Sequence, residues 1–212
     1  MSSSHRQEDL IAHYQSLLKT HGDSAQSLQY RDSESQFARF KILSEIANPL
    51  DSVLDVGCGL AHLYHYLKST GFTGNYLGVD IVPEFTAMAS QNLKDDKCAN
   101  VVLGSGLEPL PSGMDYVMLS GVFNNKMDDN QGFMHSTLER MFNAAEKGIS
   151  FNAMSSYVDY KDEELYYVDP MDIFAFCKTK LGGHPVLRHD YVVSKDGYPF
   201  EFAMYVYKQA VR

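Results

Sequence analysis

The residues that most directly indicate a functional site are two glycines, Gly57 and Gly59, and two acids, Asp55 and Asp80. An apolar run turns at Gly57 and Gly59, and Asp80 ends the next apolar run. This pattern predicts a buried strand, a glycine turn, a helix and a second strand with an acid at its tip. A βαβ unit of this kind binds a nucleoside-containing cofactor, because glycine lets a ligand approach the backbone and the acid can meet ribose hydroxyls.

The residues around the turn indicate which cofactor is bound. The dinucleotide-binding fingerprint requires a glycine or alanine where His62 stands, which opposes a dehydrogenase. Asp55 precedes the glycines, and a carboxylate there suits a cationic ammonium group better than a pyrophosphate. Asp80 follows Gly59 at close to the offset of roughly 20 residues at which an acid meets a ribose. An ordinary turn and a helix cap could explain each feature alone, but their order and distance favour a cofactor with a ribose and a positive charge.

The segment Asp55-Val-Gly57-Cys-Gly59-Leu-Ala61 resembles the first motif of the class I S-adenosylmethionine-dependent methyltransferases. That motif is an acid followed by three alternating glycines, and Ala61 stands in the place of the third glycine. The resemblance extends over roughly residues 50–152 and is closest to enzymes of the small-molecule type. It implies S-adenosyl-L-methionine as the cofactor, S-adenosyl-L-homocysteine as the product, and no metal.

The resemblance also assigns cofactor contacts. Asp80 matches the acid that holds the ribose hydroxyls, and Ile81 matches the apolar group on the adenine. Many members carry an acid after the third strand, where this chain has Gly104 and Ser105, so Ser105 or backbone groups would hold the adenine. The expected cofactor-binding residues are Asp55, Gly57, Cys58, Gly59, Asp80, Ile81, Gly104, Ser105, Ser120, Gly121, Arg39 and Gln36.

Ser120 and Gly121 resemble the segment that lies beside the methionine part of the cofactor, although a plain loop is the alternative. Gln36 and Arg39 lie in a segment that resembles the N-terminal caps of small-molecule methyltransferases. The planar cation of Arg39 could bind the cofactor's carboxylate. A solvated surface arginine is the alternative.

No catalytic residue can be assigned, and the candidates are His62, His135 and Asn124. Either histidine could act as a general base. Methyl transfer from a sulfonium mainly requires positioning, so an amine or carboxylate acceptor needs no base. We therefore expect a methyltransferase with a small-molecule oxygen, nitrogen or carboxylate acceptor. The alternatives are a protein or RNA methyltransferase and a non-catalytic cofactor-binding module.

Alternating apolar runs and helical spacings predict an α/β fold with a Rossmann-like, doubly wound and mostly parallel sheet. Residues 1–49 are expected to form an N-terminal helical cap or lid, with helices at 7–20 and 33–47, and residues 50–212 the methyltransferase domain. The expected strands are 52–56, 75–80, 100–103, 115–119 and 148–152, and the expected helices are 61–70, 84–95, 131–146 and 170–181. Extended runs at 185–193 and 200–208, joined by a turn at Ser194-Lys195-Asp196-Gly197, predict a C-terminal antiparallel hairpin.

Composition narrows the function class. The 212 residues carry a net charge of −9, which disfavours nucleic-acid partners because that affinity comes from neutralised phosphates. No apolar run has the length of a membrane span, and the first residues lack a signal peptide's apolar stretch, so a cytoplasmic location is expected. Cys58, Cys98 and Cys177, and the acids Asp128 and Asp129, lack metal-ligand spacing. The oligomeric state is left open.

Overall fold

The protein is described by a computed structural model that covers residues 3–195, 197–198 and 200–210. The helices are α1 (Ser3–His21), the 3₁₀ turn η1 (Ala25–Leu28), α2 (Ser33–Ser44), α3 (His62–Ser69), α4 (Pro83–Leu93), α5 (Asn130–Ala144) and α6 (Pro170–Thr179). The strands are β1 (Ser52–Val56), β2 (Asn75–Asp80), β3 (Ala99–Leu103), β4 (Met114–Leu119), β5 (Ala145–Ser155), β6 (Tyr167–Val168), β7 (His184–Arg188) and β8 (Glu201–Tyr207).

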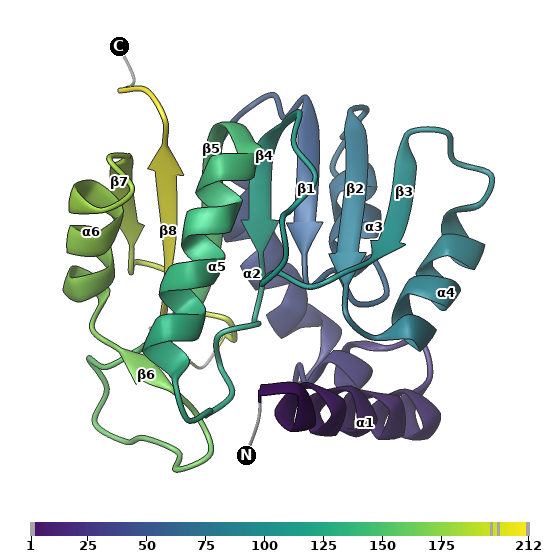
Figure 1. Ribbon diagram of the computed structural model, residues 1–212, viewed down its shortest axis with the longest axis horizontal. Helices are drawn as coiled ribbons and strands as arrows, with labels where there is room; N and C mark the ends of the chain where they lie inside the picture. The colour runs from purple at the N-terminus through teal and green to yellow at the C-terminus, as the bar shows by residue number, and fades with distance from the viewer. Residues whose placement is uncertain (1–2, 196, 199, 211–212) are drawn as a thin grey trace.

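The strands form one open sheet in the order β3-β2-β1-β4-β5-β8-β7, and β6 pairs with the end of β5. Strands β1 to β5 are parallel, whereas β8 runs antiparallel to both β5 and β7. The predicted Rossmann-like sheet with a C-terminal antiparallel pair is confirmed. Because the strands from β3 to β5 share one direction, their carboxyl ends all meet at the lower edge of the sheet in Figure 1.

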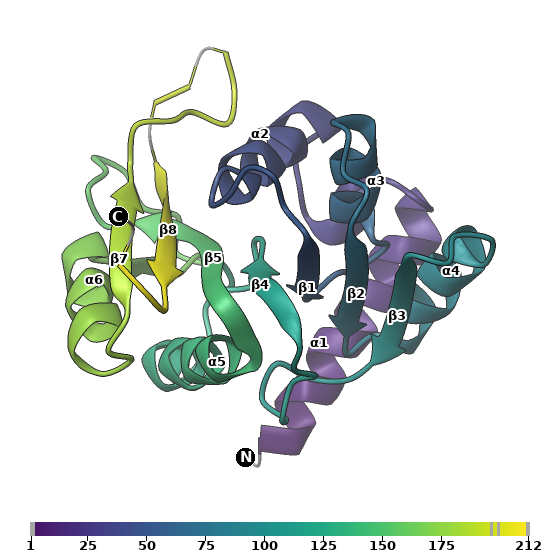
Figure 2. The same ribbon diagram turned by 90° about the horizontal axis from the view of Figure 1, so that it is seen from above.

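Helices pack on both faces of the sheet, as a doubly wound fold requires (Figure 2). On one face, α5 and α6 bury apolar side chains against the sheet; these are Met134, Leu138, Met141, Ile173 and Cys177. On the other face, α2, α3 and α4 do the same with Phe40, Leu63, Tyr64, Leu67, Ala89 and Leu93. The buried side chains of α5 and α3 recur every three or four residues, and this spacing gives each helix one apolar face.

The N-terminal helix α1 lies across the carboxyl ends of the strands (Figure 1). Ile11, Tyr14 and Leu18 on this helix pack against a buried apolar cluster that contains Leu60 and Phe85. These two residues lie just after β1 and β2, so α1 covers the edge at which open α/β sheets bind their ligands.

Three expectations about the C-terminal half were wrong. Strand β5 is longer than predicted, β6 was not predicted, and β7 and β8 are joined by the long segment 189–200 rather than by a tight turn. Strand pairing with β4 and β8 on either side extends β5 beyond its apolar centre. A turn does lie within the segment, where the Gly197 N–H donates to the Ser194 carbonyl at 3.0 Å, but Asp196 is outside the described residues.

Over the described ranges, no helix combines the length and apolar character that crossing a membrane would require. Within those same ranges, no group of three or more histidine, cysteine, aspartate or glutamate side chains is arranged to hold a metal ion.

Candidate functional site

The turn after β1 depends on glycine for its backbone shape and for space. Gly57 and Gly59 have φ angles of +74° and +52°, in the left-handed region that favours glycine. A β-carbon at Gly57 would lie 2.5 Å from a methyl group of Val122, and one at Gly59 would lie 2.5 Å from a methyl group of Leu28. Any larger residue at these positions would therefore displace its neighbours.

Asp80 holds this turn through its carboxylate. Its Oδ2 accepts the Gly59 N–H at 2.8 Å, and its Oδ1 accepts the Val82 N–H at 2.9 Å. The side chain is nearly buried, with 8% exposure, and this burial raises its pKa although the backbone hydrogen bonds oppose the shift. Because each carboxylate oxygen has a second lone pair, Asp80 can organise the turn and still accept hydrogen bonds from a ligand.

Asp55 lies deeper than Asp80, on the face of the sheet that packs against α3. It accepts a hydrogen bond from the hydroxyl of Tyr76 at 2.7 Å. Burial raises the pKa of Asp55 to about 7, with a smaller contribution from Asp80. Cys58 lies nearby, and burial holds the pKa of its thiol well above the usual range, so it is neutral and unsuited to nucleophilic chemistry.

Two residues of the N-terminal segment lie directly on the predicted cofactor loops. Leu28, at the end of η1, contacts Gly59 as described above. The Tyr30 hydroxyl lies 2.9 Å from the Ser120 Oγ and 3.2 Å from the Ser120 carbonyl oxygen, and a β-carbon on Gly121 would lie 2.9 Å from the same hydroxyl. A ligand that contacts these loops must share this space with Leu28 and Tyr30 or displace them.

The residues expected to contact the adenine also lie at the carboxyl edge of the sheet. Ile81 packs in the apolar cluster under α1. The Gly104 N–H donates to the Asp80 carbonyl at 2.9 Å, which places the segment after β3 beside the tip of β2. The Ser105 hydroxyl accepts the Leu107 N–H at 3.1 Å, so it already has a partner within its own loop.

Arg39 is buried in an ion pair and is not a solvated surface residue. Its Nε and Nη2 atoms lie 3.0 and 2.9 Å from Oε2 of Glu201 on β8. The other oxygen of Glu201 accepts a hydrogen bond from Asn152, and Asn152 in turn accepts the Gly121 N–H at 2.9 Å. Arg39 therefore reaches the loop after β4 through two intermediate side chains, and its predicted contact with a cofactor carboxylate stays a prediction.

Gln36 and His62 lie together in a cleft of about 160 Å³ between η1, α2 and α3. The two ring nitrogens of His62 lie 2.8 Å from an oxygen of Asp23 and 3.2 Å from the amide oxygen of Gln36. Asp23 also accepts a hydrogen bond from Asn92 of α4 at 3.1 Å. These contacts fix the N-terminal segment to the helices after β1 and β2, which favours a structural role for His62.

His135 and Asn124 lie on the opposite side of the edge, near α5. The His135 ring stacks on Phe176 of α6 with a centroid distance of 3.9 Å, and burial lowers its pKa. Asn124 follows β4, and its main-chain carbonyl accepts the Tyr166 N–H at 2.8 Å. Its side-chain oxygen is buried and has no hydrogen-bond partner among the described residues. The three catalytic candidates therefore do not share one site.

Sequence reasoning missed several of the residues that shape the site, namely Leu28, Tyr30, Tyr76 and Glu201, whereas Asn152 stands at the end of the expected strand 148–152. Only Tyr76 had a signal: residues 76, 78 and 80 of one strand face the same way. Gly78 between the other two has no side chain and leaves room for the Cys58 sulfur, since a β-carbon there would lie 2.7 Å from it. Leu28, Tyr30 and Glu201 come from segments far from the glycine turn in the sequence.

The site as a whole offers hydrogen-bond acceptors to a ribose and a cation, backbone groups at the glycine turn, and an apolar wall at Ile81. In chemistry, this set of groups fits a nucleoside that carries an ammonium group. In shape, Leu28 and Tyr30 lie against the turn and the loop after β4, where such a ligand would make its contacts.

The chain is similar to known proteins both in its sequence and in its structure. A family model described as a methyltransferase domain matches residues 47–181. The Mycobacterium tuberculosis protein named "Putative methyltransferase Rv1506c" is 32% identical over 154 residues, which are 69% of this chain and 91% of that protein.

Two solved structures show the same fold at low sequence identity. The magnesium protoporphyrin IX methyltransferase of Synechocystis PCC 6803, with bound SAH, aligns over 95% of both chains with 13% identity and a TM-score of 0.68. Human N-acetylserotonin methyltransferase, in complex with SAM, aligns over 98% of this chain and 68% of its own with 16% identity and a TM-score of 0.60.

Proposed function

Because the chain belongs to the class I S-adenosylmethionine-dependent methyltransferases, we propose that it transfers the methyl group to a small molecule. The acceptor atom is an oxygen, a nitrogen or a carboxylate oxygen. The observation that carries this proposal is the cover over the carboxyl edge of the sheet, formed by α1, Leu28 and Tyr30. A covered edge suits an acceptor that can be enclosed, and the net charge of −9 opposes the binding of a phosphate backbone.

The proposed cofactor contacts follow the edge from β2 to β4. Asp80 binds the ribose hydroxyls, Ile81 packs on the adenine, and the segment at Gly104 and Ser105 lies beside it. The glycine turn and the loop at Gly121 contact the methionine part. When bound, the cofactor supplies a methyl group that is activated by a sulfonium, so the protein mainly has to position the acceptor for in-line attack.

The N-terminal residues 1–49 are proposed to act as a cap on the domain formed by residues 50–212. Asp23 joins η1 to both α3 and α4, and Gln15 of α1 donates to the carboxylate of Glu84 on α4 at 2.9 and 3.0 Å. These polar contacts are exposed and individually weak, so they add little to the free-energy cost of moving α1 and η1 away from the edge.

The class of acceptor can be tested by following a labelled methyl group. The purified protein is incubated with methyl-tritiated S-adenosylmethionine and a cell extract that has been divided into small molecules, protein and RNA. We expect the label to enter the small-molecule fraction only. Incorporation into protein or RNA would contradict the proposed acceptor class, and Gly59→Leu serves as the control because its side chain fills the cofactor turn.

A further inference from the structure

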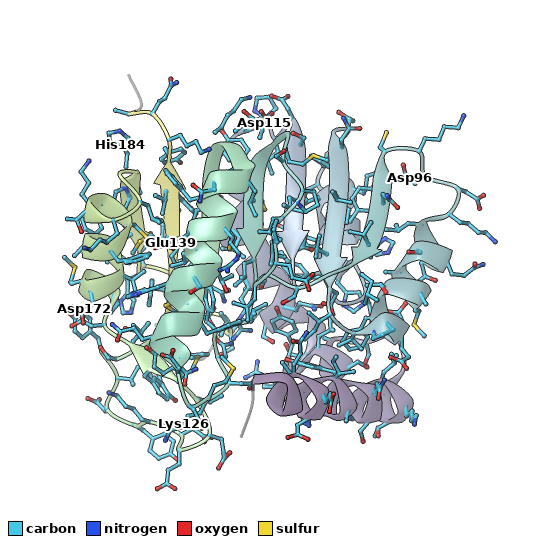
Figure 3. All side chains as sticks on the ribbon, viewed as in Figure 1. Asp96, Asp115, Lys126, Glu139, Asp172 and His184 are labelled. Atoms are coloured by element: carbon cyan, nitrogen blue, oxygen red, sulfur yellow. The ribbon has the colours of Figure 1, made fainter. Side chains whose placement is uncertain are left out.

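The chain crosses the carboxyl edge of the sheet directly after β4. In Figure 3, Asp115 near the start of β4 lies at the upper edge of the sheet, and Lys126 lies below the lower edge. Ser120 and Gly121 come directly after the last residue of β4, so the peptide unit between them lies at the carboxyl edge. This is the loop that is proposed to contact the methionine part of the cofactor.

The peptide unit between Ser120 and Gly121 is hydrogen-bonded on both sides. The Gly121 N–H donates to Oδ1 of Asn152 on β5 at 2.9 Å. The Ser120 carbonyl oxygen accepts the hydroxyl of Tyr30 at 3.2 Å. In a trans peptide the N–H and the carbonyl point in opposite directions, so the bond to Asn152 turns the carbonyl toward the N-terminal segment.

The orientation of the Asn152 amide depends on Glu201. Its Nδ2 donates to Oε1 of Glu201 at 3.3 Å. A carboxylate only accepts hydrogen bonds, so Glu201 keeps the amide nitrogen on its own side and the amide oxygen on the side of Gly121. A reversed amide would place its nitrogen against the Gly121 N–H, and neither group could accept a hydrogen bond from the other.

Arg39 joins the two sides of this arrangement. Its Nε and Nη2 lie 3.0 and 2.9 Å from Oε2 of Glu201, so this carboxylate, with 1% exposure, is paired with a cation where it is buried. The guanidinium of Arg39 also lies over the ring of Tyr30, 5.3 Å from its centroid, within the range of a cation–π interaction. Arg39 therefore supports both the Asn152 side and the Tyr30 side of the peptide unit.

We propose that Asn152, Glu201 and Arg39 are positioning residues for the cofactor. They fix the peptide unit after β4 so that the Ser120 carbonyl, which has a second lone pair, is available to the ammonium group of the methionine part. A carbonyl that is fixed before the ligand arrives needs no reorganisation on binding. The proposal rests on the proposed function, which places the methionine part at this loop, and it gives Arg39 a role through other side chains.

Two ligands that share adenosine and differ in the methionine part test this proposal. S-adenosylhomocysteine carries the amino and carboxylate groups, whereas 5′-methylthioadenosine lacks both. Their dissociation constants for the full chain are measured by calorimetry. We expect Asn152→Leu, which cannot accept the Gly121 N–H, to weaken S-adenosylhomocysteine about tenfold, because the peptide unit is free to turn its carbonyl away. The affinity for 5′-methylthioadenosine should stay within about twofold.

A second variant and a control separate positioning from stability. Glu201→Gln keeps the shape of the side chain but no longer dictates the orientation of Asn152, and it should weaken S-adenosylhomocysteine about threefold to fivefold. Tyr207→Phe is the matched control, because the Tyr207 hydroxyl donates to the Ile46 carbonyl at 2.8 Å and likewise joins β8 to the chain near α2. This control should leave the ratio of the two affinities unchanged.

The ratio of the two affinities decides the outcome, since a purely structural network would change both ligands alike. An unchanged ratio in a variant that still binds 5′-methylthioadenosine, or an equal change of ratio in Tyr207→Phe, would overturn the proposal. A wild-type preference for S-adenosylhomocysteine that persists in both variants would confine the failure to the positioning residues and leave the methyltransferase function standing. Equal binding of the two ligands by the wild type would overturn the proposed contact at this loop as well.

Discussion

At the scale of single residues, Asp80 has two tasks. It accepts the Gly59 N–H of the glycine turn and the Val82 N–H before α4, and it is also proposed to bind the ribose hydroxyls. A loss of cofactor affinity after mutation of Asp80 would by itself not separate these tasks, because a distorted turn also weakens binding.

These two roles of Asp80 can be separated by comparing a ligand that has the ribose hydroxyls with one that lacks them. We expect the wild-type protein to bind adenosine at least about tenfold more tightly than 2′,3′-dideoxyadenosine, because hydrogen bonds to a charged group contribute about 1.5–3 kcal/mol. Asp80→Asn should bind both ligands with nearly equal affinity, as measured by calorimetry. A distorted turn would weaken both ligands alike, so a hydroxyl preference that persists in Asp80→Asn would refute the ribose assignment.

At the scale of elements, the proposed N-terminal cap contacts the glycine turn. Leu28 touches Gly59 and also packs in the apolar cluster under α1, to which Leu18 belongs as well. If the ligand displaces Leu28, the population of the form in which this contact is open limits the apparent affinity.

Shortening the Leu28 side chain should therefore raise the rate at which the cofactor binds. We expect Leu28→Ala to raise the association rate constant of S-adenosylhomocysteine severalfold in stopped-flow fluorescence. Leu18→Ala is the matched control: it loses a similar amount of buried apolar area, on the order of 1–2 kcal/mol, but Leu18 is not among the atoms nearest to Gly59. Equal acceleration in the two variants would mean that general loosening of the cap, rather than contact with Gly59, controls entry.

The sequence predicts some elements better than others for physical reasons. The bounds of β1 and β2 match the predicted 52–56 and 75–80, because both are short apolar runs that end at glycine or an acid. Strand β6 has two residues, too few to show a period of two. The contact of Leu28 with Gly59 could not be predicted, because it depends on how η1 folds back over a turn that lies far along the chain.

At the scale of the whole molecule, one buried ion pair joins the N-terminal cap to the sheet. Arg39 of α2 and Glu201 of β8 are separated by most of the sequence, and both side chains are nearly buried. No sequence pattern predicts such a pair, because arginine and glutamate taken singly are usually exposed at the surface. Only the closed fold brings the two charges together and removes them from water.

The two partners of this ion pair should be coupled in their contributions to stability. We expect Arg39→Met to lower the free energy of unfolding by about 3–5 kcal/mol, because it leaves a buried carboxylate unpaired. Combining it with Glu201→Gln should cost less than the sum of the two single changes, with a coupling energy of about 1–3 kcal/mol in urea denaturation. Additive losses would show that the two side chains do not stabilise each other.

The position of β8 has a consequence for synthesis on the ribosome. The strand pairs with β5 on one side and β7 on the other, yet it is made after both. Until residues 201–207 emerge, the almost fully buried β5 is an apolar edge without a partner, and edges of this kind recruit strands from other chains. In a nascent chain that edge of β5 therefore stays open to such pairing until β8 is available, and products truncated before Glu201 would carry the open edge permanently.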